Sequence, residues 1–258
     1  MTEGAAEHVR SLSRGLAVVR ALGNAPGGRT LSDVARDTGL TRAAARRFLH
    51  TLVELGYART DDRHFSLTPR VLELGHAYLS SFGLADVAQP HLEALSAQVG
   101  ESCSVSVLDG TDVVYVARSA VSRLMTVGIA VGTRFPAYAT SMGRVLLAEL
   151  SGPELDAHLA AAEPRPLTAR TETSPARLRA VLDGVRRTGW CLVDQELEVG
   201  LRAVAAPLRD RSGAAVAACN VSTAAHRTTL DGVRRRLLPP LLATCARIEA
   251  DFANLRRV

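Results

Sequence analysis

The stretch LSDVARDTGLTRAAARRFLHTLVELG, residues 31–56, constrains the fold of this chain more than any other segment. Apolar residues recur at helical spacing in both of its halves, which predicts two short amphipathic helices. Gly39 lies between them, where a positive backbone φ ends the first helix, and Thr41 can cap the second. Two short helices joined by a glycine-containing turn predict a helix-turn-helix.

The outer face of the second helix is basic and carries small residues at its start. Arginine forks can bind guanine edges or neutralise phosphates, and the sequence leaves open which arginine does which. Ala43 and Ala44 allow a close approach to base edges, and the start of the preceding helix can bind a phosphate. The residues that we expect to contact DNA are Thr30, Ser32, Thr41, Arg42, Ala43, Ala44, Arg46, Arg47, His50, Arg59 and Arg63.

Residues 57–67 predict a hairpin directly after the second helix, with a turn at Asp61–Asp62. Arg59 and Arg63 lie on or beside its tip, as in the wing of a winged helix-turn-helix. Ser13 can cap a first helix that ends near Leu22. We therefore expect a winged helix-turn-helix DNA-binding domain over residues 1–75. The alternative is an arginine-bearing helix in an unrelated helical domain, which the order of these elements disfavours.

The rest of the chain predicts linker helices over residues 76–98 and a mixed domain over residues 99–258. Alternating and apolar runs separated by turn residues place strands and helices along the second domain. The fold class is therefore α+β. The expected strands are a hairpin over 102–119 and segments 124–133, 190–194, 201–208 and 214–221, and the expected helices are 141–150, 152–162, 175–188 and 229–254.

Composition excludes several classes of protein more clearly than it supports one. The net charge is +5, but residues 1–76 hold 11 arginines against eight acidic residues, so charge adds little to the DNA argument. No apolar stretch approaches the roughly 18–20 residues needed to span a bilayer. The N-terminal MTEGAAEHVRS has no secretion signal pattern, so we expect a cytoplasmic protein.

The cysteines and histidines argue against a metal site or a disulfide framework. The four cysteines are scattered without a CxxC pair, and the seven histidines show no HxH or HxxxH spacing. We expect isolated buried thiols, no metal and no cofactor.

The segment DQELEVGLR raises the possibility of an enzyme, because Asp194, Glu196 and Glu198 are closely spaced. On a strand, alternation would place all three carboxylates on one face, whereas on a loop that inference fails. No histidine lies nearby in sequence, and the chain has no glycine-rich phosphate loop or nucleophile elbow. We therefore expect a structural role for these acids and no catalytic residues.

Several of these segments together resemble the IclR family of bacterial transcription regulators, over nearly the full length of the chain. They are LSRGLAVVRAL, the helix-turn-helix, residues 57–67 and DQELEVGLRAVAAPL. The stretch VGTRFPAYATSMGRVLLA is similar to the branch that controls the β-ketoadipate pathway of aromatic acid catabolism. The resemblance implies a GAF-like α/β effector-binding domain behind the winged helix-turn-helix. It also implies a homodimer or a dimer of dimers on a double-stranded DNA operator.

The same resemblance implies an effector pocket in the second domain. Its contacts would come from Ser141 and Met142 and from strands around Asp194, Ala203, Asn220 and Ser222. Several members have cysteine where this chain has Ala203, and small or hydroxylated residues where it has Met142 and Asn220. These departures disfavour a very small acid such as glyoxylate.

A small organic acid needs a cation or backbone N–H groups for its carboxylate, together with apolar walls. The helix that begins at Ser141 offers N–H groups, Arg134 offers a guanidinium, and Tyr138 offers a ring. The alternatives are that Arg134 pairs with a nearby acid and that Tyr138 packs in the core. Arg123 is a weaker candidate. The expected effector is an aromatic acid such as protocatechuate or 4-hydroxybenzoate, or a β-ketoadipate-like acid.

Three functions compete at this point. The first is a regulator of aromatic catabolism genes, in which the effector favours one of two conformations and so changes operator affinity. The second is an enzyme of small organic acids with an attached DNA-binding module, motivated only by the acidic cluster. The third is a regulator whose sensor domain has lost its ligand and serves only in dimerisation.

Overall fold

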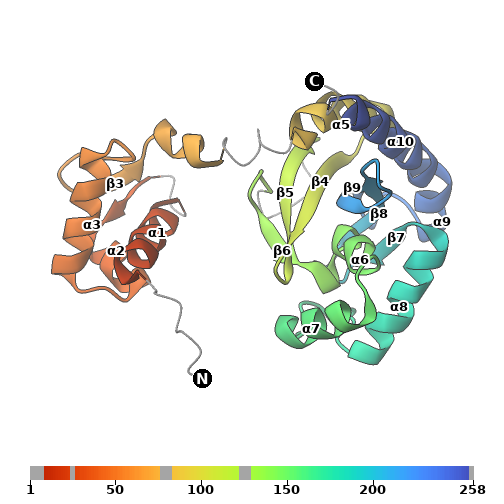
Figure 1. Ribbon diagram of the computed structural model, residues 1–258, viewed down its shortest axis with the longest axis horizontal. Helices are drawn as coiled ribbons and strands as arrows, with labels where there is room; N and C mark the ends of the chain where they lie inside the picture. The colour runs from red at the N-terminus through yellow and green to blue at the C-terminus, as the bar shows by residue number, and fades with distance from the viewer. Residues whose placement is uncertain (1–8, 24–26, 76–82, 122–128, 256–258) are drawn as a thin grey trace. The chain divides into compact units, whose positions relative to one another are not determined.

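The computed structural model describes residues 9–23, 27–75, 83–121 and 129–255, and the chain divides into two compact units after Tyr78 (Figure 1). The expected fold class, a helix-turn-helix domain followed by a mixed α/β domain, is confirmed. Among the described residues, no helix combines the length and the apolar character that crossing a membrane would need.

The first unit packs three helices against a small antiparallel sheet with the strand order β1-β3-β2. Its core is formed by apolar residues that recur at helical spacing, among them Val18, Val34, Leu49 and Phe65, all buried. The elements are α1 (Arg10–Gly23), β1 (Arg29–Thr30), α2 (Leu31–Thr38), α3 (Arg42–Glu54), β2 (Ala58–Thr60), β3 (His64–Leu67) and the 3-10 turn η1 (Pro69–Val71).

Helix α1 begins earlier than the sequence predicts. Ser13 lies inside the helix, and its hydroxyl donates to the Val9 carbonyl, four residues back, instead of capping the N-terminus. A serine within a helix can bond the preceding turn in this way. The expected N-cap at Ser13 is therefore wrong.

The second unit is built on an antiparallel six-stranded sheet with the order β6-β5-β4-β9-β8-β7. The expected strand over 124–133 lies partly outside the described residues, and its described part, 129–133, is not a strand. The edge strand instead comprises the three residues that follow. The strands are β4 (Ser102–Asp109), β5 (Asp112–Ser119), β6 (Arg134–Pro136), β7 (Cys191–Asp194), β8 (Leu201–Arg209) and β9 (Ala215–Ala224).

Helices cover both faces of this sheet, and each face has its own core (Figure 1). Helices α5 (Leu84–Val99) and α10 (Leu238–Leu255) pack on one face. The short turn η2 (Ala137–Ala139) and helices α6 (Ser141–Leu147), α7 (Gly152–Ala162) and α8 (Pro175–Thr188) pack on the other. Before α10, the chain passes through α9 (Leu230–Gly232) and a π-helical turn, η3 (Val233–Leu237).

Helix α5 belongs to the second unit, whereas the sequence analysis assigned residues 76–98 to linker helices. Leu84, Leu92 and Leu95 are fully or almost fully buried in the core that α5 shares with α10 and the sheet. Residues 76–82 lie outside the described part of the chain.

The four cysteines are buried and free. The sequence predicted isolated thiols, but Cys219 and Cys245 belong to the same core and affect each other. The neighbouring Cys245 side chain and then burial raise the pKa of the Cys219 thiol well above its ordinary value, and burial raises the pKa of Cys103 to about 12. Both thiols are therefore protonated and inert near neutral pH.

Candidate nucleic-acid interface and effector pocket

The helix-turn-helix is shaped by two side-chain caps and one glycine. Thr30 accepts a hydrogen bond from the Asp33 amide at the start of α2, and Thr41 accepts one from the Ala44 amide at the start of α3, both at 3.2 Å. Gly39 has a φ of 65° and ends α2 in the left-handed region. This conformation favours glycine, and it turns the chain sharply between the two helices.

Helix α3 presents three arginines to solvent with no acidic partner. Arg42, Arg46 and Arg47 are exposed, and none forms an ion pair with any residue that the structure describes. On α2 the opposite holds, because Arg36 pairs with Asp33 at 2.8 Å and Asp37 binds Arg29 at 3.0 Å. Helix α3, unlike α2, therefore presents uncompensated positive charge, as phosphate binding requires.

The hairpin β2–β3 has the form expected of a wing. The Asp61 carboxylate accepts hydrogen bonds from the His64 and Arg63 amides, which hold the turn and lower the pKa of Asp61. The Arg59 side chain bonds the Ser66 hydroxyl across the two strands. Arg63 is exposed in the turn and has no ion pair among the described residues. One arginine is thus held along the wing, and the other is free at its tip.

The remaining residues expected at the DNA surface differ in how available they are. Ser32, Ala43 and His50 are exposed, and Ala44 is half-buried. The Thr30 hydroxyl already has two hydrogen bonds, because it accepts one from the Asp33 amide and donates one to the Asp33 carboxylate at 2.7 Å. Its side chain therefore serves first as a helix cap, and a phosphate bond from it would need a rearrangement.

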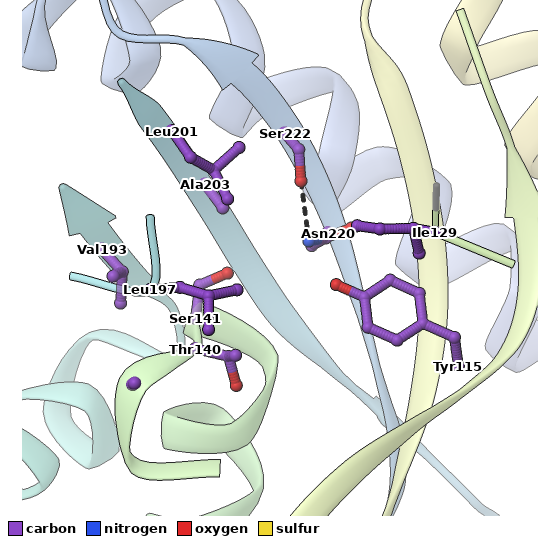
Figure 2. A pocket seen from close by; sticks show the side chains of 11 residues that line it. Tyr115, Ile129, Thr140, Ser141, Val193, Leu197, Leu201, Ala203, Asn220 and Ser222 are labelled. Carbon is purple, nitrogen blue, oxygen red and sulfur yellow. Dashed lines mark hydrogen bonds between the residues drawn. The ribbon is translucent and has the colours of Figure 1, made fainter. Parts of the chain in front are cut away.

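A pocket in the second unit lies between the start of α6 and the sheet (Figure 2). The cavity has a volume of about 20 Å³, and of about 360 Å³ when the space open to solvent is included. The cavity itself fits about one water, which is far below the roughly 300–1,000 Å³ of ligand pockets. A ligand with one ring therefore requires lining side chains to move outward. The lining residues are Tyr115, Ile129, Ala139, Thr140, Ser141, Val193, Leu197, Leu201, Ala203, Asn220 and Ser222.

Two buried polar atoms in this pocket have no hydrogen-bond partner among the residues that the structure describes. They are the Ser141 hydroxyl oxygen and the Asn220 side-chain carbonyl oxygen. The Asn220 amide nitrogen donates to the Ser222 hydroxyl at 3.1 Å, which leaves the carbonyl free to accept a hydrogen bond (Figure 2). Buried polar atoms without partners are costly, so their presence in one cavity indicates a binding site for a polar molecule.

Tyr115 adds a third polar group to the pocket from strand β5 (Figure 2). Burial raises the pKa of its hydroxyl to about 12, so the group is a neutral hydrogen-bond donor and acceptor near pH 7. The other walls are mostly aliphatic, from Ile129, Val193, Leu197 and Leu201. The chemistry suits a small molecule with apolar faces and polar ends.

A buried ion pair holds one wall of the pocket. Arg144 on α6 is 3% exposed and binds Glu196 through two hydrogen bonds of 2.6 Å each, and it also donates to the Tyr138 carbonyl. Glu196 lies in the loop between β7 and β8, next to Leu197, which lines the pocket. The pair therefore attaches this loop to α6.

Four of the eight expected effector contacts line the pocket, namely Ser141, Ala203, Asn220 and Ser222. Arg134 does not. It lies on the edge strand β6, where it binds Asp109 at 2.6 Å and Asp112 at 3.1 Å. Tyr138 does not line it either, because its buried ring packs in the core and its hydroxyl bonds the Arg165 backbone. Arg134 therefore pairs with nearby acids and Tyr138 packs in the core, as the two alternatives predicted.

Met142 and Asp194 lie next to the pocket without lining it. Met142 is the helical neighbour of Ser141 and points into the core, where its sulfur accepts a hydrogen bond from Ser106. Asp194 follows Val193 on a strand, so alternation turns it to the other face, where it binds Arg202 at 2.7 Å. Arg123 lies outside the described residues.

The acidic cluster does not form a catalytic group. Asp194 ends strand β7, and Glu196 and Glu198 lie in the following loop, so strand alternation does not align them. Asp194 and Glu196 bind different arginines. Among the described residues, no group of three or more histidines, cysteines or acids is arranged to hold a metal.

Tyr115 on β5 and the serines Ser104 and Ser106 on β4 were not among the site residues expected from the sequence. The signal was present in SCSVSV, where serines alternate with buried valines on a strand that is covered on both faces. A polar stripe on a covered sheet face indicates a site beneath the covering element. The helix start at Ser141 contributes less than expected, because α6 has seven residues and Thr140 already binds the Gly143 amide.

A helix-turn-helix with free arginines, joined to a sheet domain with a small polar-ended pocket, defines the class of DNA-binding regulators with a separate sensing domain. Two family models match the chain: the IclR helix-turn-helix domain over residues 11–62 and the bacterial transcriptional regulator IclR C-terminal domain over residues 76–250. The chain belongs to the IclR family of bacterial transcriptional regulators. The expected family is confirmed, and its members are regulators, not enzymes.

Individual relatives point to aromatic catabolism. The chain is 48% identical to the Pca regulon regulatory protein of Pseudomonas putida, over 93% of this chain and 83% of that protein. It is 37% identical to the p-hydroxybenzoate hydroxylase transcriptional activator of Acinetobacter baylyi, over 92% and 90%. A crystal structure of an IclR homologue from Microbacterium hydrocarbonoxydans complexed with 4-hydroxybenzoate matches with a TM-score of 0.81 at 27% identity, over 94% and 98%.

Proposed function

We propose that this regulator controls genes of aromatic acid catabolism and that its effector is an aromatic acid bound between α6 and the sheet. The observation that carries the proposal is the pair of partnerless polar atoms, on Ser141 and Asn220, inside a pocket with aliphatic walls. An aromatic ring fills the space between such walls, and a ring hydroxyl or carboxyl group satisfies the polar atoms.

The relatives support the same class of effector. One is named as the activator of p-hydroxybenzoate hydroxylase transcription, and one solved homologue holds 4-hydroxybenzoate. We therefore expect 4-hydroxybenzoate or protocatechuate as the effector, with a β-ketoadipate-like acid as the alternative. Of the effector contacts expected from the sequence, we propose the four that line the pocket, namely Ser141, Ala203, Asn220 and Ser222.

On DNA, we propose that Arg42, Arg46, Arg47 and Arg63 contact the operator. Their guanidinium groups are exposed, and none pairs with an acid among the described residues. An α-helix of this kind fits the major groove, and a wing reaches the neighbouring phosphates or the minor groove.

We further propose that the regulator acts as a homodimer, or as a dimer of dimers. Helix α1 and the residue before it expose apolar side chains at helical spacing: Val9 is 58% exposed, Leu12 is 64% and Leu16 is 44%. Such a stripe on a small domain favours contact with a second copy. The effector then acts by changing the spacing of two recognition helices.

Calorimetric titration of the full-length protein against 4-hydroxybenzoate, protocatechuate and β-ketoadipate tests the effector. We expect saturable one-site binding by at least one aromatic acid, and a matching change in DNase footprints upstream of the neighbouring genes. Binding of β-ketoadipate alone would favour the alternative acid. Absence of binding by all three would contradict the proposal and favour a regulator whose sensor serves only in dimerisation.

A further inference from the structure

The proposed effector is an acid, yet none of the described residues that line the pocket carries a positive charge. A carboxylate taken out of water without a cationic partner is costly. Arg134 cannot supply the charge in its present place, because Asp109 and Asp112 already bind it at the sheet edge. A cation near the pocket would compensate the carboxylate more strongly than neutral donors do.

Arg118 on strand β5 has the required position in the sheet. Ser104 on β4 is the register partner of Arg118 on one side and of Asn220 on the other. Directly paired residues of neighbouring strands project from the same face. Arg118, Ser104 and Asn220 thus form one row across three strands, on the face that α6 covers.

The side chain of Arg118 is directed along this row. Its Nη1 lies 3.2 Å from the Ser104 hydroxyl, on the central strand of the row. Adjacent strands are about 4.8 Å apart. A guanidinium above Ser104 therefore lies about one strand spacing from Asn220, which lines the pocket.

A bulge in β5 puts Arg118 on this face. Val105 pairs with Ala117 and Ser106 pairs with Tyr115, so Val116 is the additional residue of the bulge. Val116 and Ala117 both join the core beneath α5 and α10, and Arg118 then turns toward the α6 side with Tyr115. Without the bulge, strict alternation would place Tyr115 and Arg118 on opposite faces.

Arg118 also lacks the partners that a half-buried guanidinium normally has. Within the described ranges, its buried Nε has no hydrogen-bond partner and its guanidinium forms no ion pair. Burial lowers the pKa of the Arg118 guanidinium, the direction expected of a cation without a counter-ion.

We infer that Arg118 is the group that binds the effector carboxylate, with Ser104 orienting the guanidinium toward the pocket. The inference rests on the proposed function, because it assigns the acid end of the same ligand. A carboxylate at Arg118 satisfies the free Nε and supplies the missing counter-ion. The ring then lies against the aliphatic walls, and its hydroxyl group is left to donate to the Asn220 carbonyl oxygen.

The test compares an acid with its neutral amide, in the full-length protein. We expect the wild type to bind 4-hydroxybenzoate about 10–100-fold more tightly than 4-hydroxybenzamide, since only the acid forms a charge-assisted pair. In Arg118→Gln, affinity for the acid should fall about 10–100-fold while affinity for the amide changes little. Protocatechuate should show the same loss, and Arg118→Lys should recover part of the acid affinity because it restores the charge.

Arg134→Gln is the matched control, because it removes the same charge from a guanidinium bound at the sheet edge. Its preference for acid over amide should equal that of the wild type. An Arg118→Gln protein that keeps this preference would overturn the inference and leave the proposed function standing. If the wild type binds neither acid, the proposed function itself fails. Loss of acid and amide binding together would show a structural role for Arg118 and would also overturn the inference.

Discussion

At the scale of single residues, the arginines of this lysine-free chain do different work according to their partners. Arg36 and Arg134 are neutralised by aspartates, and Arg144 is buried against Glu196. Arg46 on α3 has no acid beside it among the described residues. Residue type alone therefore does not separate the arginines that acids neutralise from those that are available to bind DNA.

We expect Arg46→Ala to weaken operator binding by about 10–100-fold, because the exposed guanidinium loses a base-edge or phosphate contact worth roughly 1–3 kcal/mol. Gel-shift titrations at several salt concentrations check this, and a phosphate contact would also reduce the salt slope by about one. The control is Arg36→Ala, whose side chain is already bound by Asp33. Equal losses in both variants would place the DNA surface elsewhere in the domain.

The Arg144–Glu196 pair makes a second prediction at this scale. Arg144→Met leaves the Glu196 carboxylate with little solvent and without its partner, and should lower the free energy of unfolding by about 3–5 kcal/mol. Adding Glu196→Gln should recover part of this loss, because the unpaired charge is removed. Urea unfolding followed by the fluorescence of Trp190, the single tryptophan, measures both variants. A double variant less stable than Arg144→Met would contradict this account.

At the scale of elements, the pocket depends on how closely α6 approaches the turn before it. A Cβ on Gly143 would lie 2.2 Å from the Ala137 carbonyl oxygen, a separation that no side chain permits. The glycine therefore allows the turn η2 and the first turn of α6 to pack against each other. Ala139, Thr140 and Ser141, which line the pocket, come from this junction.

We expect Gly143→Ala to lower the free energy of unfolding of the second unit by about 1–3 kcal/mol or more. The added methyl group would meet backbone atoms, which cannot move aside as a flexible side chain can. Effector affinity should fall with it, since the start of α6 must shift. Gly152→Ala is the control, because a Cβ there meets nothing within 4 Å. Trp190 fluorescence in urea and calorimetry with 4-hydroxybenzoate measure the two effects. Similar behaviour of the two variants would show that the junction can relax.

At the scale of the whole molecule, stability should depend on pH with a definite sign. Burial lowers the pKa of His158 below its ordinary value of 6.5, and hydrogen bonds lower the pKa of several carboxyl groups. In each case the folded chain binds protons less readily than the unfolded chain. Stability is therefore present at higher pH and is lost as pH falls. The carboxyl groups are those of Asp33, Asp61, Glu154, Glu172 and Asp194. At Asp194, burial acts to raise the pKa, but the hydrogen bonds and charges of its neighbours, Arg202 first, lower it overall.

We expect the free energy of unfolding to decrease from about pH 6.5 downward as His158 is protonated in the unfolded chain, and more steeply below about pH 5 as the carboxyl groups follow. Urea unfolding at intervals between pH 8 and pH 3 measures the profile. His158→Gln should flatten the part between pH 6.5 and pH 5 and leave the steeper part unchanged. Stability that rises as the solution is acidified would contradict the assigned pKa directions.

The sequence by itself determined the elements and the family. Caps, glycines and apolar periodicity are local signals, and they located the helix-turn-helix, the wing and most strands and helices of the second domain. They misplaced the start of α1 and the edge strand β6. In α1, the Ser13 hydroxyl bonds the Val9 carbonyl instead of capping the helix. Strand β6 forms where the chain pairs with β5. The fold class and the family were thus predictable.

Only the tertiary structure decided which side chains meet. Arg134 and Tyr138 looked suitable for a ligand, but Asp109 and the Arg165 backbone lie next to them in space and not in sequence. Tyr115 and Asn220 reach one pocket because the strand register pairs each of them with a serine on the same face of β4, and a bulge in β5 brings Arg118 to that face. Register, bulges and ion pairs depend on contacts between distant segments, and no local pattern encodes them.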